Sequence, residues 1–97
     1  MREKDIEAKL CEAAKKLGGK AIKFTSPYYT GMPDRLVLLP KGLCVFVEMK
    51  APGGRQSKLQ RCRAAKLAGL GHAVFVVDDS GSLADFISWL RQRLVEV

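Results

Sequence analysis

The sequence contains few of the residues that build metal clusters or disulfide frameworks. Its 97 residues include one histidine and three cysteines. Cys11, Cys44 and Cys62 form no C-x-x-C pair, which argues against a structural zinc site. An odd number of cysteines at apolar positions predicts reduced thiols in the core of a cytosolic protein.

Long apolar runs are also missing. The N-terminal stretch MREKDIEAKL is charged, and no apolar run is long enough to span a bilayer. We therefore expect no signal peptide, no membrane partner and a cytoplasmic location. The length predicts a single domain over residues 1–97.

Acidic residues are scarce relative to basic ones. Lys and Arg total 17 against 10 Asp and Glu, which gives a net charge of +7. No acid occurs between Met49 and Val77, a segment that carries six basic residues: Lys50, Arg55, Lys58, Arg61, Arg63 and Lys66. This excess favours an anionic partner, nucleic acid rather than membrane. The alternative is an ordinary solvated helix face.

Apolar periodicity predicts an α/β fold with the element order αβββαβα. The expected helices are 5–17, 57–68 and a last one that begins near residue 80; the expected strands are 20–24, 34–39, 43–50 and 72–78. The strands at 34–39 and 43–50 should form an antiparallel hairpin, and 57–68 should connect two parallel strands. The apolar run at 72–78 is typical of a strand covered on both faces.

The hairpin determines whether two carboxylates meet. If Pro40–Gly42 forms a three-residue loop, Asp34 lies across from Glu48 with their Cβ atoms roughly 5 Å apart. Glu48 and Lys50 share a face because side chains alternate along a strand. A two-residue turn would instead send Asp34 to the opposite face.

Two neighbouring carboxylates repel each other, and a divalent cation such as Mg²⁺ or Mn²⁺ would remove that conflict. On a basic protein, a metal held by acids beside a lysine indicates phosphodiester hydrolysis. The cation would polarise the phosphoryl oxygen and activate a water, and Lys50 would orient that water or stabilise the developing charge. The alternative is a structural ion pair of Lys50 with Asp34 or Glu48, with Arg35 involved.

These residues also carry a family resemblance. The segments GMPD, ending at Asp34, and VEMK, with Glu48 and Lys50, resemble the P-D…(D/E)-x-K signature of the PD-(D/E)XK nuclease superfamily. The stretch KFTSPYYTGMPDRLVLLPKGLCVFVEMKAPGGRQSKLQ is similar to stand-alone phage and bacterial members of the VRR-NUC (virus-type replication-repair nuclease) family. The resemblance covers residues 7–77 and implies a restriction-endonuclease-like αβββαβ core followed by a C-terminal helix.

The resemblance also implies roles for individual residues. Asp34, Glu48 and the main-chain carbonyl of Met49 would bind Mg²⁺ or Mn²⁺, and Lys50 would be the catalytic lysine. Gln60 matches the family's glutamine, and its helical spacing with Ala64 and Leu67 predicts a face turned towards the sheet. By itself, Gln60 could equally be an exposed polar residue.

Superfamily members also use a glutamate on the first helix. Glu7 fits this position, and Glu3 is its rival one turn earlier. Either residue could instead be favourable negative charge near a helix N-terminus.

The substrate implied by the resemblance is DNA, cut at four-way (Holliday) junctions by a homodimer in the cytoplasm of a bacterium or a phage-infected host. The alternatives are a flap or nicking nuclease and a non-catalytic nucleic-acid-binding module.

The expected phosphate contacts are Lys20, Lys23, Arg55, Lys58, Arg61, Arg63 and Lys66. Tyr28 and Tyr29 could stack on an exposed base at a branch point or be ordinary surface residues. Leu59, Cys62 and Trp89 could belong to a dimer interface or be scattered surface apolar residues.

Overall fold

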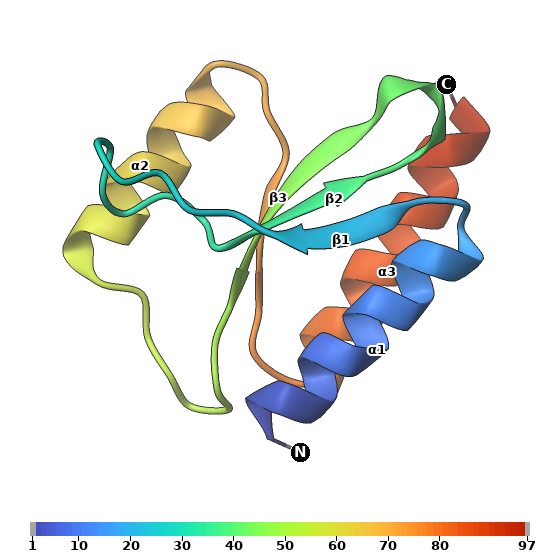
Figure 1. Ribbon diagram of the computed structural model, residues 1–97, viewed down its shortest axis with the longest axis horizontal. Helices are drawn as coiled ribbons and strands as arrows, with labels where there is room; N and C mark the ends of the chain where they lie inside the picture. Colours follow the sequence, from blue (N-terminus) through green and yellow to red (C-terminus); the bar gives the residue numbers. More distant parts are fainter. Residues whose placement is uncertain (1, 97) are drawn as a thin grey trace.

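The computed structural model describes residues 2–96 and has the predicted order of elements (Figure 1). The helices are α1 (Glu3–Lys16), α2 (Lys58–Gly69) and α3 (Ser80–Glu96). The strands are β1 (Lys20–Lys23), β2 (Arg35–Leu38), β3 (Cys44–Met49) and β4 (Val74–Val77). A single 3-10 turn, η1 (Pro40–Gly42), connects β2 to β3. The predicted αβββαβα order is therefore confirmed.

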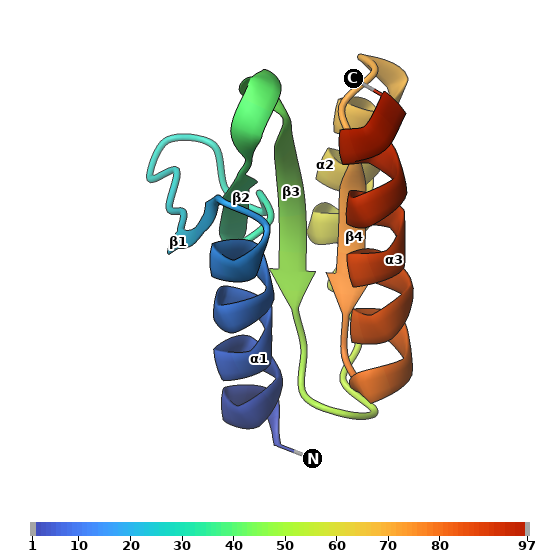
Figure 2. The ribbon, with the colours of Figure 1, turned by 90° about the vertical axis from the view of Figure 1, so that its right-hand side faces the viewer.

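The four strands form one mixed sheet in the order β1-β2-β3-β4. β2 is antiparallel to both of its neighbours, β1 and β3, and β4 runs parallel to β3 after the crossover through α2. Figure 2 shows α1 and α3 in front of the sheet and α2 behind it. The sheet is therefore flanked by helices on both faces, as predicted.

The main core lies between the sheet and the pair α1 and α3. Alternate residues of β3 face this side, and Val45, Val47 and Met49 are at most 2% exposed. The helices contribute side chains at helical spacing that are at most 4% exposed: Ile6, Leu10 and Ala14 from α1, and Leu83, Phe86 and Leu90 from α3. The period of two in the strand and of about 3.6 in the helices thus directs apolar residues to the same interior.

Trp89 belongs to this core rather than to a free surface. Its ring lies 4.8 Å from that of Phe75, measured between centroids, and Phe75 also contacts Phe86. Trp89 lies at the edge of the stripe that Leu83, Phe86 and Leu90 form on α3. The aromatic side chain is long enough to reach the sheet from the edge of that stripe.

The opposite face of the sheet is only partly covered. Leu38 is 40% exposed and Val76 is 37% exposed on that side. The prediction that the 72–78 strand is covered on both faces is wrong in this respect, because α2 buries no residue completely and covers only part of the sheet.

The three cysteines are exposed, so their predicted position in the core is wrong. Cys11 lies beside the buried stripe of α1, Cys44 on the partly covered face of β3, and Cys62 on α2. Leu10 beside Cys11 and Val45 beside Cys44 face inwards, whereas Cys62 lies between Arg61 and Arg63 on a helix without a buried residue. In residues 2–96, no helix combines the length and apolar character needed to cross a membrane.

The turn between β2 and β3 has three residues, the length that places Asp34 across from Glu48. The Leu39 N–H donates to the Leu43 carbonyl oxygen at 2.8 Å, and Lys41 has a φ of 65°. Arg35 therefore opposes Val47, and each following residue of β2 opposes the preceding residue of β3. One step beyond the ladder, the same register brings Asp34 opposite Glu48.

Gly19, at the corner between α1 and β1, is predicted to be essential for packing. A Cβ at this position would overlap the Leu38 carbonyl oxygen and lie 2.8 Å from Leu39 Cδ2. Gly19→Ala should lower the free energy of unfolding by about 1–3 kcal/mol, because backbone must move to admit the methyl group. Chemical denaturation measures this change.

Gly69→Ala is the matched control. A Cβ there meets no atom within 4 Å at the end of α2, so the substitution should be neutral or slightly stabilising. Equal denaturation midpoints for wild type and Gly19→Ala would contradict the predicted overlap.

Candidate active site

Glu48 is the only buried charged residue in the described part of the chain, at 2% exposure. Its Oε2 accepts a hydrogen bond from Gln60 Nε2 at 3.1 Å and lies 3.3 Å from Lys50 Nζ. Its Oε1 is buried and has no hydrogen-bond partner in residues 2–96. A buried oxygen without a partner is costly, and it is a feature expected of a group that binds a ligand.

Asp34 extends the contact between β2 and β3 through its side chain. Its Oδ1 accepts a hydrogen bond from the Met49 N–H at 2.9 Å. The side-chain oxygen thus takes the place of the main-chain carbonyl that a paired strand would offer. The Asp34 carbonyl oxygen accepts from the Phe24 N–H at 2.9 Å. The side chain is nevertheless 38% exposed, so a fixed carboxylate opens towards solvent beside the buried one.

The surroundings of Glu48 disfavour its ionised form. Burial raises the pKa of the Glu48 carboxyl above its usual value, and the nearby Asp34 carboxylate raises it further. The charge of Lys50 and hydrogen bonds to the carboxylate lower this pKa, but to a smaller extent. Lys50 and the hydrogen bonds therefore only partly offset the effect of burial and of Asp34 on Glu48.

Gln60 turns towards the sheet, as its spacing predicted. Ser57 caps α2: its Oγ accepts from the Gln60 N–H at 3.1 Å, and the Gln60 side-chain oxygen accepts from the Ser57 N–H at 2.8 Å. This capping box occupies the amide oxygen and leaves the amide nitrogen to donate to Glu48. The S-x-x-Q pattern at residues 57–60 is the sequence signal that predicts this orientation.

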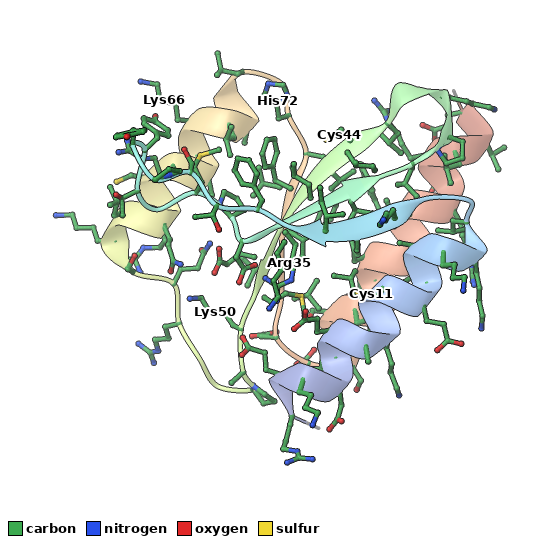
Figure 3. All side chains as sticks on the ribbon, viewed as in Figure 1. Cys11, Arg35, Cys44, Lys50, Lys66 and His72 are labelled. Carbon is green, nitrogen blue, oxygen red and sulfur yellow. The ribbon has the colours of Figure 1, made fainter. Side chains whose placement is uncertain are left out.

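Arg35 has a larger part in the site than the sequence indicated. Its Nη2 lies 2.9 Å from Glu7 Oε2, and its Nη1 lies 3.4 Å from Asp34 Oδ2 and donates to the Asp34 carbonyl oxygen at 3.0 Å. Its side chain is 11% exposed. Figure 3 shows Arg35 and Lys50 between α2 and the N-terminal part of α1.

Glu7 is therefore connected to Asp34 through a guanidinium. Its carboxylate pairs with Arg35, and its side chain is 30% exposed. Glu3 is exposed in the first turn of α1 and belongs to none of these contacts. Of the two candidate glutamates, only Glu7 belongs to the same network as Asp34.

The donor set fits a hard divalent cation. Glu48 offers an oxygen without a partner, and Asp34 adds a second carboxylate. The Met49 N–H points to Asp34, and the carbonyl of the same residue is directed to the same side in an antiparallel ladder. Within residues 2–96, no three His, Cys, Asp or Glu side chains gather as a metal cluster, so the carbonyl and waters would complete the shell.

The predicted phosphate contacts are mostly exposed side chains: Lys20, Lys23, Arg55, Lys58, Arg61 and Lys66. Arg61 donates to the Gln56 carbonyl oxygen at 3.1 Å. Arg63 differs from the others because it is partly buried and bonded to the 24–33 loop. Lys66 extends from the outer side of α2 in Figure 3.

Two comparisons place this chain among known proteins. It is 49% identical over 78 residues to "Putative nuclease p44" of Acyrthosiphon pisum secondary endosymbiont phage 1, a match that covers 80% of this chain and 84% of that protein. A solved structure described as a VRR_NUC domain has a TM-score of 0.82 and 29% identity, over 89% of this chain and 94% of that one. No family sequence model matches the chain.

Burial of the Glu48 carboxylate, together with the nearby Asp34 carboxylate, predicts that Glu48 destabilises the protein when no metal is present. Glu48→Gln keeps an acceptor oxygen for Gln60 and Lys50 and removes the buried charge. In chelator at pH 7, we expect it to raise the free energy of unfolding by about 1 kcal/mol, or Tm by roughly 4–8 °C. Thermal unfolding followed by circular dichroism measures this.

The effect should depend on pH in a defined direction. Because the pKa of Glu48 is raised in the folded state, folding binds a proton between its usual value, 4.5, and the raised value. Wild-type stability attributable to Glu48 should therefore rise as pH falls, and the advantage of Glu48→Gln should shrink towards pH 4.5. Glu12→Gln, at an exposed residue of α1, is the control and should change stability by less than about 0.5 kcal/mol. A Glu48→Gln protein less stable than wild type at pH 7 would contradict this reasoning.

Proposed function

Because the chain belongs to the VRR-NUC family of nucleases, we propose that it is a metal-dependent endodeoxyribonuclease that cuts four-way DNA junctions as a homodimer. One observation carries the proposed chemistry. A buried carboxylate with a free oxygen, Glu48, lies beside the Asp34 carboxylate and the Lys50 ammonium on a protein of net charge +7.

Asp34, Glu48 and the main-chain carbonyl of Met49 would hold Mg²⁺ or Mn²⁺. When bound, the ion would supply Lewis-acid chemistry at the scissile phosphate and its attacking water. The residues prepare this site before metal arrives. Gln60 holds one Glu48 oxygen and leaves the other available, and Arg35 restrains the Asp34 carboxylate.

Lys50 is the proposed catalytic lysine. Its Nζ lies 3.3 Å from Glu48 Oε2, and its side chain is 21% exposed, so the ammonium lies between the buried acid and solvent. From this position it would donate to the attacking water or to a phosphate oxygen as negative charge develops. The ion pair with Glu48 keeps the side chain in place until substrate arrives. Glu7, held by Arg35, would supply a further carboxylate at the edge of the site.

Phosphate contacts from the exposed basic residues would supply affinity without reading sequence. Recognition of DNA shape is therefore more natural than a defined cleavage sequence. A four-way junction has two scissile strands related by a two-fold axis, and one chain supplies one candidate site. A two-fold dimer would place two sites on such a substrate. The phage relative supports action in the cytoplasm of a bacterial host.

The substrate is tested with labelled DNA of several shapes. We expect cutting of a four-way junction in Mg²⁺ or Mn²⁺, no cutting in chelator, and much slower cutting of linear duplex of the same sequence. Sedimentation should give twice the 10.7 kDa mass of the chain. Preferential cutting of flaps or nicks would replace the junction assignment with another DNA specificity, and binding without cutting in any metal would indicate a non-catalytic module.

The roles of individual residues are tested by kinetics. Glu48→Gln and Lys50→Ala should each reduce the single-turnover rate by about 10²–10⁴-fold while junction binding is retained, because both act on the reacting phosphate. Lys58→Ala, at an exposed residue of α2, should weaken binding with little effect on the rate of bound substrate. A fully active Lys50→Ala enzyme would show that the proposed role of this lysine is wrong.

A further inference from the structure

The loop between β1 and β2 is attached to α2 rather than free in solvent. Gly31 has a φ of +93° and lies so close to α2 that a Cβ there would be 2.7 Å from Leu59 Cγ and 3.2 Å from Arg63 Cγ. Figure 1 shows this loop crossing α2. Only glycine permits both the backbone conformation and this close approach.

Arg63 makes the polar part of the attachment. Its Nε donates to the Thr30 carbonyl oxygen at 2.9 Å, and its guanidinium carbon lies 3.8 Å from the centre of the Tyr29 ring. Both contacts use features specific to arginine, a directed N–H and a flat cation that stacks on an aromatic face. The guanidinium is thus already engaged by the loop.

The two tyrosines of the loop have different surroundings. Tyr29 is stacked against Arg63 and is 41% exposed, whereas Tyr28 is 100% exposed. The Tyr29 N–H donates to the Ser26 carbonyl oxygen at 3.2 Å. This bond closes a turn over residues 26–29, in which Tyr28 is one of the two central residues. The concave side of the loop is lined by residues 24–27 and 29–32, without Tyr28. An anchored loop therefore presents one aromatic ring outwards.

This loop shares its supports with the candidate active site. Asp34 follows Tyr28 by six residues, and Pro33, directly before Asp34, is buried. On α2, Gln60 contacts Glu48, and its neighbours Leu59 and Arg63 contact the loop. The loop backbone that carries Tyr28 is thus held relative to both carboxylates through two separate connections.

We propose that Tyr28 stacks on the face of a base left unstacked at a DNA branch point, and that Arg63 is a positioning residue that holds the loop for this contact. The inference rests on the proposed function in taking branched DNA as the substrate. Bases inside a continuous duplex have both faces covered by neighbours, so a stacking residue selects the places where that stacking is broken. Aromatic stacking tolerates any base, which suits a protein that recognises shape.

The stacking contact is tested by binding in chelator, where cutting does not interfere. A four-way junction carries 2-aminopurine at each branch-point position in turn, and a control duplex carries it within an arm. Wild-type protein should quench the fluorescence of the branch-point label at one position or more. Tyr28→Phe should give the same quenching. Tyr28→Ala should lose the quenching and about 10-fold of junction affinity, with duplex affinity unchanged within twofold. Unchanged quenching and affinity in Tyr28→Ala would overturn the proposal.

The role of Arg63 is separated from a phosphate contact by a substitution that keeps the charge. Arg63→Lys retains a cation but loses the flat stack and the directed N–H, so it should lose quenching and junction preference as Tyr28→Ala does. The double variant Tyr28→Ala/Arg63→Lys should prefer the junction over the duplex as much as either single variant does, because both substitutions remove the same contact. Thermal unfolding of each variant verifies that the fold is intact. Wild-type behaviour of Arg63→Lys would overturn the positioning role.

Lys66→Ala is the matched control on the same helix. Lys66 is exposed and is a proposed phosphate contact. Its substitution should weaken junction and duplex binding by the same factor, and it should reduce the slope of log affinity against log salt concentration by about one. Tyr28-dependent quenching without any cleavage would count against the proposed nuclease activity alone. Junction cleavage that is unaffected in Tyr28→Ala would count against the loop proposal alone.

Discussion

The register of the β2–β3 hairpin is the constraint on which the candidate site depends. The three-residue turn at Pro40–Gly42 pairs Arg35 with Val47, and the Met49 N–H then bonds to the Asp34 carboxylate at 2.9 Å. A shift of one residue would send every side chain of β2 to the opposite face. The same shift would take the buried Val37 out of the main core and turn Asp34 towards it, so packing against the core favours the observed arrangement of the carboxylates.

The site keeps an unfavourable interaction that the rest of the fold must offset. Glu48 is buried beside a second carboxylate, and one of its oxygens has no partner in the described chain. An apolar residue at this position would make the protein more stable and remove the carboxylate that is proposed to bind the metal. Retained destabilisation of this kind is common where a site must bind a cation or substrate, and the core beneath β3 supplies the compensating stability.

Helix α2 has a second role besides covering the sheet. None of its residues is fully buried, yet Gln60 orients Glu48 and Arg63 holds the loop that carries Tyr28. The helix connects the proposed chemistry to the proposed recognition of DNA shape. Its basic exposed side would then bring the phosphate backbone to both.

The sequence by itself determined the order of elements and the common face of Glu48 and Lys50, because these follow from local periodicity. The hairpin register depended on the length of the turn at Pro40–Gly42, and the structure decided that length. The sequence also contained the capping box that orients Gln60. Only the tertiary structure decided that Arg35 connects Glu7 to Asp34, that Arg63 engages the loop, and that the cysteines face solvent. Those features depend on how elements distant in the chain pack together, and local spacing carries no information about which side chains meet across that distance.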